Sequence, residues 1–211
     1  MSDTLLEERI DTAAYRLELE RTGTVMIPPF VLFSKEEFQE MERLYRALPE
    51  EVVKIGDAGE PNDLYVGRFM VDKPGDLPTM VNRPHSDRLI ALLKAPKRAD
   101  FFREILGGDR HIRRCQVNRM VTTSYIGYHL DIDSNPDYEV SVVLQLGQAF
   151  TGGEFVVYPR DGIVNSFTPQ YGTAIVSKCI YPHEVKRVNS GERVSLVYFY
   201  SNHEFENRRA Q

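Results

Sequence analysis

The sequence predicts an α+β fold, in which helices from the first half of the chain pack on one side of a β-sandwich or barrel built by the second half. Helical spacing and helix-capping signals are concentrated before about residue 108. From Arg110 onward, runs rich in β-branched and aromatic residues are separated by turn signals. These runs are not separated by helical patterns, so their pairing should be mostly antiparallel. The predicted strands cover residues 111–123, 139–147, 153–158, 172–179 and 193–201, with a turn at 189–191 before the last.

Four segments of the first half have helical character. The first predicted helix has apolar residues at helical spacing from Leu5 to Leu17 and a stop signal at Thr22-Gly23, and the other three cover residues 34–48, 87–94 and 97–106. The second of these begins with a capping box, in which Ser34 can cap the amide of Glu37 and the Glu37 side chain can reach back. A short strand is predicted at residues 24–27, between the first two helices.

Residues 56–86 show no clear periodicity and are rich in Gly, Pro, Asp and Asn. A stretch of this length within a compact domain is usually functional or disordered. We expect a single strand within it, at residues 64–71. We also expect the stretch to act as a lid over a binding site.

Length and composition indicate one domain spanning residues 1–211, with helical support mainly in 1–108, a β core mainly in 109–201 and a polar tail in 202–211. The formal net charge of −5 disfavours a general nucleic-acid binder, because such proteins neutralise phosphates with basic surfaces. Apolar runs do not approach the roughly 18 residues of a membrane span. We therefore expect a small-molecule substrate and neither a nucleic-acid nor a membrane partner; the oligomeric state is left open.

The chain has two cysteines, Cys115 and Cys179, both in apolar surroundings and neither in a C-x-x-C pair. This pattern favours buried free thiols in a reducing compartment. The N-terminal residues also lack the basic and apolar regions of a signal peptide. The expected location is cytoplasmic.

A candidate metal site is formed by His129, Asp131 and His183. In extended chain, residues i and i+2 point to the same face, so His129 and Asp131 can reach one ion. Two histidines and one carboxylate on one face of an octahedral ion make the ligand set of non-haem iron(II) oxygenases. Three protein ligands leave three positions, which is enough for a bidentate cosubstrate and dioxygen.

A candidate carboxylate receptor follows the third ligand. Arg193 lies ten residues after His183, and Ser195 shares its face of the predicted strand. A guanidinium beside a hydroxyl binds a carboxylate through charge-assisted, bidentate hydrogen bonds. The apolar neighbours Val194 and Leu196 favour this role over that of a solvated charge at a strand end.

These residues together resemble the iron(II)/2-oxoglutarate-dependent dioxygenase superfamily, in particular its prolyl-hydroxylase-like and small amino-acid hydroxylase members. The resemblance covers roughly residues 23–201. The matching segments are His129-Leu130-Asp131, Gly152-Gly153-Glu154-Phe155, Tyr181-Pro182-His183, Arg193-Val194-Ser195 and the opening Gly23-Thr24-Val25-Met26-Ile27-Pro28. The resemblance implies a double-stranded β-helix (jelly-roll) core, with Fe(II), 2-oxoglutarate and dioxygen as cofactor and cosubstrates.

The resemblance also implies residue roles. Arg193 would bind the distal carboxylate of 2-oxoglutarate, while the 2-oxo acid end would chelate the iron. Relatives often have a tyrosine on the strand before His-x-Asp that helps to hold 2-oxoglutarate. This chain has Gln116-Val117-Asn118-Arg119-Met120 there, and Asn118 or Arg119 is the candidate replacement.

The expected reaction is hydroxylation of an unactivated C–H bond. Related halogenases have a small residue in place of the carboxylate, so Asp131 favours hydroxylation over halogenation. The expected substrate is a small polar molecule, such as a free amino acid or a related metabolite. Asp133 and Arg68 are candidate substrate contacts, for an amine and a carboxylate respectively.

Three other functions stay open. A peptidyl hydroxylase of the prolyl type would act on a protein and would need an exposed groove beside the iron. Repair of a nucleobase or alkyl lesion is disfavoured by the acidic charge. A non-enzymatic, cupin-like metal-binding or sensor protein would not need the pair Arg193 and Ser195.

Overall fold

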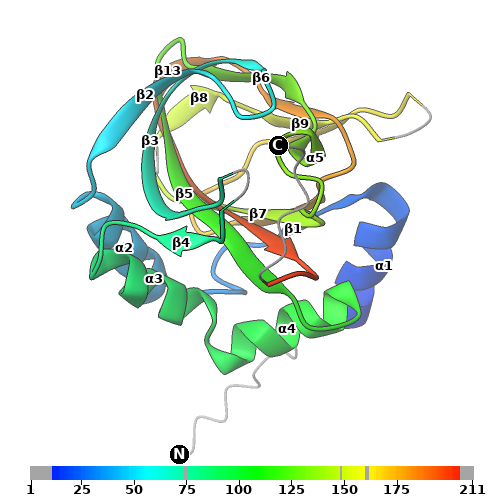
Figure 1. Cartoon of the computed structure of the whole chain (residues 1–211). Coiled ribbons are helices and arrows are strands. Elements are labelled where there is room, and N and C mark those ends of the chain that lie inside the picture. Colours follow the sequence, from blue (N-terminus) through cyan, green and yellow to red (C-terminus); the bar gives the residue numbers. More distant parts are fainter. Residues whose placement is uncertain (1–10, 74–75, 148, 160–161, 205–211) are drawn as a thin grey trace, which may run out of the picture.

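The computed structural model describes residues 11–73, 76–147, 149–159 and 162–204. Two antiparallel sheets face each other and close into a flattened barrel, and helices lie against one of them (Figure 1). This arrangement confirms the predicted α+β fold with a double-stranded β-helix core. The start of the first predicted helix and most of the predicted polar tail lie outside the described residues.

The larger sheet has the strand order β1-β11-β7-β13-β5-β3, and β2 and β4 pair with β3. Its strands are β1 (Thr24–Ile27), β2 (Glu50–Ile55), β3 (Pro61–Val71), β4 (Thr79–Met80), β5 (His111–Val121), β7 (Val140–Gln145), β11 (Ala174–Lys178) and β13 (Val188–Ser201). β13 pairs along most of its length with β5 on one side and β7 on the other. It also pairs through Val188–Gly191 with β8 (Phe150–Gly152).

The smaller sheet has the order β6-β12-β9-β10. Its strands are β6 (Tyr125–His129), β9 (Phe155–Val157), β10 (Asn165–Phe167) and β12 (His183–Val185). The first residues of β3 pair with β6, Asn62 with Ile126 and Asp63 with Tyr125, so β3 joins the two sheets along one side. A Cβ at Gly127 would lie 2.6 Å from the Pro61 carbonyl oxygen, so glycine permits this close approach of the two strands.

Four helices support the larger sheet: α1 (Thr12–Thr22), α2 (Lys35–Tyr45), α3 (His85–Leu93) and α4 (Pro96–Leu106). They lie together on one side of the barrel (Figure 1). Their buried faces share one apolar core with the outward side chains of the sheet; Phe38, Leu89 and Phe102 lie in it with Leu144 and Leu196. The expected one-sided helical support is confirmed. No helix in the described part of the chain combines the length and apolarity needed to cross a membrane.

The capping box of α2 is also confirmed. Ser34 Oγ accepts a hydrogen bond from the Glu37 amide, and the Glu37 carboxylate accepts one from the Ser34 amide. The helix itself ends at Tyr45, and the predicted last turn to residue 48 is wrong. Residues 46 to 48 instead form a tight turn that leads directly into β2.

Two other predictions about the chain were wrong. The strand predicted at residues 64–71 is confirmed as part of β3, but it is not the single strand of the stretch 56–86: β3 begins at Pro61 and forms a long hairpin with β2, and β4 and the start of α3 also lie in this stretch. The predicted turn at residues 189–191 is instead the start of β13, which pairs with β8 through a bulge. In both places polar or Gly-rich strand residues carry no apolar alternation, so the sequence pattern was lost.

Candidate active site

A cavity opens between the two sheets. Alternate residues of β3, β5 and β13 line its wall on the larger sheet. The opposite wall comes from β6, β9 and β12, and the β2–β3 turn at Gly56 to Glu60 lies across one side. The alternation follows from the strand period of two, which sends every second side chain inward.

The structure brings His129, Asp131 and His183 together in this cavity. Each offers one ligand atom, and the three atoms lie within 4.8 Å of one another. His129 Nε2 is 3.5 Å from Asp131 Oδ1, and His183 Nε2 is 3.6 Å from Asp131 Oδ2. All three side chains are largely buried: the exposed fraction is 11% for His129, 7% for Asp131 and 7% for His183.

Local backbone irregularities direct these ligands inward. His129 pairs with His183 and Ile126 pairs with Val185, so β6 has one extra residue in this interval and forms a bulge. Such bulges re-aim a side chain, which here lets both Ile126 and His129 face the cavity. The sequence suggested that Asp131 lies on extended chain. In the structure it instead begins the short helix α5 (Asp131–Ser134), which follows β6.

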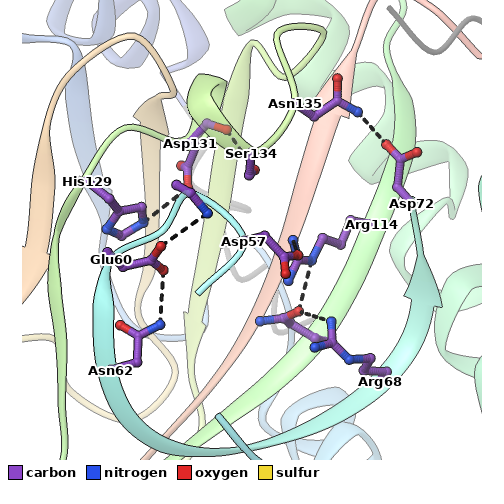
Figure 2. Close-up of polar contacts among 12 residues, drawn as sticks. Asp57, Glu60, Asn62, Arg68, Asp72, Arg114, His129, Asp131, Ser134 and Asn135 are labelled. Carbon is purple, nitrogen blue, oxygen red and sulfur yellow. Dashed lines mark hydrogen bonds and ion pairs between the residues drawn. The ribbon is translucent and has the colours of Figure 1, made fainter. Parts of the chain in front are cut away.

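Backbone carbonyls fix the two imidazole rings. His129 Nδ1 donates to the Gly127 carbonyl at 2.8 Å, and His183 Nδ1 lies 3.2 Å from the Tyr181 carbonyl. A ring whose Nδ1 carries the proton presents the lone pair of Nε2, as histidine ligands of metals usually do. Both Nε2 atoms face Asp131 (Figure 2 shows His129).

The site's electrostatics suit a cation. Burial raises the pKa of Asp131, but the electrostatic interaction with His183 and the hydrogen bond and electrostatic interaction with His129 outweigh it, so the net pKa is lowered. Burial lowers the pKa of His183, and Asp131 only partly offsets this. Asp131 Oδ2 is buried without a hydrogen-bond partner among the described residues. A buried carboxylate oxygen left unsatisfied beside two imidazole lone pairs fits a metal ion as the missing partner.

Arg193 is buried at the other end of the cavity, on β13. It is 1% exposed, and Nη1 donates to Ser195 Oγ at 3.2 Å. Nε and Nη2 have no hydrogen-bond partner among the residues that the structure describes. Burial lowers the pKa of Arg193 to about 10, so the guanidinium is still charged at neutral pH. A buried, charged fork with two free donors fits a carboxylate ligand, because a buried charge is otherwise strongly unfavourable.

Asn118 and Ser195 line the same part of the cavity and are register partners across β5 and β13. Asn118 Oδ1 accepts a hydrogen bond from Gln116 Nε2 at 2.8 Å, which leaves its amide nitrogen for another partner. Arg119, the other candidate from the sequence, points to the opposite face of β5, where it pairs with Glu50 and Glu192. Of the two, Asn118 is the one near Arg193.

The two candidate substrate contacts have different positions. Arg68 on β3 lines the cavity, where it donates to Gln116 Oε1 at 3.3 Å and pairs with Glu51. Asp133 is exposed on α5 and lines a separate surface hollow beside Pro136 and Lys178. The expectation that Asp133 contacts the substrate is therefore corrected: the helical turn at Asp131 directs Asp133 away from the cavity.

Sequence reasoning missed several polar residues that line the cavity, namely Asp57, Glu60, Asn62, Arg114 and Gln116. Arg114 pairs with Asp57 and donates to Gln116, while Glu60 accepts from Asn62 and from the Ala58 amide (Figure 2). The signal for two of them was present. Arg114, Gln116 and Asn118 occupy alternate positions of one strand, so they share a face.

Comparisons with known proteins identify the family. The family model described as the 2OG-Fe(II) oxygenase superfamily matches residues 115–201. A crystal structure described as an oxidoreductase of the 2OG-Fe(II) oxygenase family, from Burkholderia pseudomallei, is 51% identical over 94% of both chains, with a TM-score of 0.90. A comparison with curated proteins gave no match.

More distant structures share the fold. A prolyl-4-hydroxylase from Pseudomonas putida is 19% identical, with a TM-score of 0.64, over 91% of this chain and 99% of that chain. The epimerase SnoN in complex with Fe3+, alpha ketoglutarate and nogalamycin RO is 13% identical, with a TM-score of 0.71, over 94% of this chain and 86% of that chain. The chain therefore belongs to the 2OG-Fe(II) oxygenase superfamily and is an Fe(II)- and 2-oxoglutarate-dependent dioxygenase.

Proposed function

We propose that the enzyme hydroxylates an unactivated C–H bond of a small polar substrate, a free amino acid or a related metabolite. In this proposal His129, Asp131 and His183 hold the iron, and Arg193 holds the distal carboxylate of 2-oxoglutarate. The observation that carries it is the pairing of a three-residue ligand cluster with a buried, under-paired guanidinium in one cavity. Bound iron and 2-oxoglutarate supply the activation of dioxygen that C–H oxidation requires.

The protein's own residues position the cosubstrate and exclude water. Ser195 and Asn118 lie beside Arg193 and would hydrogen-bond the same carboxylate. Val143, Val197 and Phe155 form apolar parts of the wall, which limits water near the reacting bond. The carboxylate of Asp131 completes the ligand set, which favours hydroxylation over halogenation.

A small substrate is supported by how the cavity is covered. The turn from Gly56 to Glu60 lies across one side and is held by the ion pair between Asp57 and Arg114. Polar groups inside the cavity have both signs of charge, with Arg68 and Arg114 against Asp57 and Glu60. A zwitterion such as a free amino acid matches such a lining better than an apolar molecule does. That neither nucleic acid nor membrane takes part stays a prediction.

The proposal is tested by adding iron(II) and 2-oxoglutarate without oxygen. The wild type should develop a weak visible charge-transfer band, and an Arg193→Ala protein should not. The aerobic wild type should then release succinate with a pool of free amino acids or with a cell metabolite extract, and mass spectrometry should find a product that has gained one oxygen. A wild type with neither band nor succinate refutes the enzyme, and an oxygen gained only by a co-purifying protein makes it a peptidyl hydroxylase.

A further inference from the structure

Three buried arginines on two neighbouring strands differ in how their charges are balanced. Arg113 pairs with Asp72, and both side chains are 0% exposed. Arg193 has no carboxylate partner among the described residues, which fits its proposed role with 2-oxoglutarate. Arg114 is intermediate: its side chain is 10% exposed, but its partner Asp57 is 48% exposed and lies on the β2–β3 turn.

A buried guanidinium needs an anionic partner, because an isolated charge away from water is costly. The partner need not be permanent. Asp57 is half in solvent, so it can rotate away from Arg114 and regain hydration at little cost, whereas Asp72 cannot leave Arg113 without burying an unpaired charge. Arg114 is therefore the buried cation whose anion can be exchanged.

Arg114 is held as a receptor inside the cavity. Gln116 Oε1 accepts from Arg114 Nε at 2.9 Å and from Arg68 Nη1 at 3.3 Å, so one amide oxygen fixes both guanidinium groups side by side (Figure 2). The Arg114 guanidinium also lies over the Phe199 ring, 5.8 Å from its centroid. Arg68, like Arg114, is paired with a carboxylate that is about half exposed to solvent: the side chain of its partner Glu51 is 55% exposed.

The register of the larger sheet separates the two basic ends of the cavity. Arg193 pairs with Met120, while Arg114 pairs with Phe199, six residues further along both strands. At about 3.3 Å per residue, this places the backbones of the two arginines on the order of 20 Å apart. Burial lowers the pKa of Arg114, but Tyr138, Asp57 and Asp131 together outweigh it, so the net pKa is raised and the guanidinium stays charged.

We propose that Arg114, with Arg68 and Gln116, binds a carboxylate of the substrate, which displaces Asp57. The inference rests on the proposed function, because it assigns the second basic end of the same cavity to the molecule that is oxidised. The substrate is then a small carboxylic acid, with a free amino acid as the leading class. Asp57 holds the β2–β3 turn over the cavity until the substrate carboxylate takes its place.

The test compares matched probes and matched variants. The wild type, with iron, 2-oxoglutarate and oxygen, is given the twenty free amino acids, their C-terminal amides and a fractionated metabolite extract. Every compound that gains oxygen should be an acid, and its amide should fail. Arg114→Gln should raise KM for that acid about 30-fold or more, as expected for one partner of a buried charge pair, while the anaerobic visible band of the 2-oxoglutarate complex is unchanged.

Two further variants separate recognition from architecture. Asp57→Asn removes the competing carboxylate, so KM should stay equal or fall; an equal loss in Asp57→Asn and Arg114→Gln would mean that the pair only holds the turn. Arg119→Gln removes an arginine from the outer face of the same strand and should change neither KM nor the band.

Failure of the substrate-carboxylate inference and failure of the proposed hydroxylase function give different results in these experiments. An amide oxidised as well as its acid overturns this inference even if Arg114→Gln does not fold, because that comparison uses only the wild type. A wild type that forms the visible band and oxidises a substrate without an acidic group overturns the inference and leaves the hydroxylase intact. A wild type without band or succinate overturns both.

Discussion

His129 and His183 are register partners across β6 and β12, and their ring centroids lie 4.3 Å apart. The sheet sets this distance, because antiparallel pairing brings together two residues that are far apart in the sequence. Asp131 joins them from the first turn after β6. The ligand cluster is thus built on strand ends and one tight turn, which are positions with little freedom to move.

Loss of Asp131 should abolish iron binding. Asp131→Gly removes the only anionic member of the cluster and leaves two imidazoles. We expect iron(II) affinity to fall by more than the roughly 10- to 100-fold that groups outside the ligand set typically contribute. Anaerobic equilibrium dialysis measures it, with Asp133→Gly as the matched control, since Asp133 is exposed and lies outside the cavity. Unchanged iron binding and hydroxylation in Asp131→Gly would remove Asp131 from the ligand set.

When 2-oxoglutarate is not bound, the buried charge of Arg193 should lower the free energy of unfolding of the wild-type protein. Arg193→Met replaces a buried, under-paired charge by an apolar side chain of similar length. Such replacements are often stabilising by about 1–4 kcal/mol. We expect a higher free energy of unfolding in urea for the variant, together with loss of the anaerobic visible band. The hypothesis that Arg193 is kept for binding fails if the variant is less stable than the wild type and still forms the band.

Sequence patterns predicted the parts of the fold whose side chains alternate clearly or repeat at helical spacing. The helices on one face and the strands of the β core follow from this. The ligand cluster and Arg193 were predicted in another way, from the short spacings of His129 to Asp131 and of His183 to Arg193 together with the family resemblance. The sequence predicted β3 from Leu64 onward but missed its start, where Asn62 points inward at a position where a buried strand is expected to be apolar. Polar residues that serve a cavity therefore weaken the very pattern that reveals the strand.

The sequence also could not show which charged side chains meet in the fold, because such contacts depend on how distant segments pair. Asp57 and Arg114 are far apart in the sequence, and only the hairpin β2–β3 brings the turn over β5. Asp133 looked equivalent to Asp131 as long as both were read as extended chain. Both lie in the single turn of α5, where positions i and i+2 point to nearly opposite sides of the helix, and a four-residue helix gives no periodic signal.

Both cysteines should resist alkylation in the folded protein. Cys115 and Cys179 are 0% exposed, and burial raises the pKa of each thiol. The thiolate is the reactive form, so a raised pKa lowers its fraction at pH 8 and burial blocks the reagent as well. Mass spectrometry after iodoacetamide at pH 8 should show no adduct on the native protein and two after unfolding in urea. One fast adduct on the native protein would contradict the buried position of that cysteine.

The pair Asp72 and Arg113 should be a main determinant of stability near the active site. Both side chains are fully buried, Asn135 Nδ2 donates to Asp72 Oδ2 at 2.7 Å, and the Asn135 amide donates to the Asp131 carbonyl. Asp72→Asn leaves Arg113 charged and buried, so the free energy of unfolding should fall by about 3–5 kcal/mol.

The double variant Asp72→Asn/Arg113→Met removes the orphaned charge and should recover part of this loss in urea unfolding at pH 7. Because Asn135 directly follows α5, iron affinity should also fall in the single variant and stay lowered in the double variant, since in both a neutral amide replaces the carboxylate that accepts the charge-assisted hydrogen bond from Asn135. Equal stabilities of the single and double variants would show that the charge on Arg113 is balanced by other groups, and the contribution assigned to Asp72 would then be wrong.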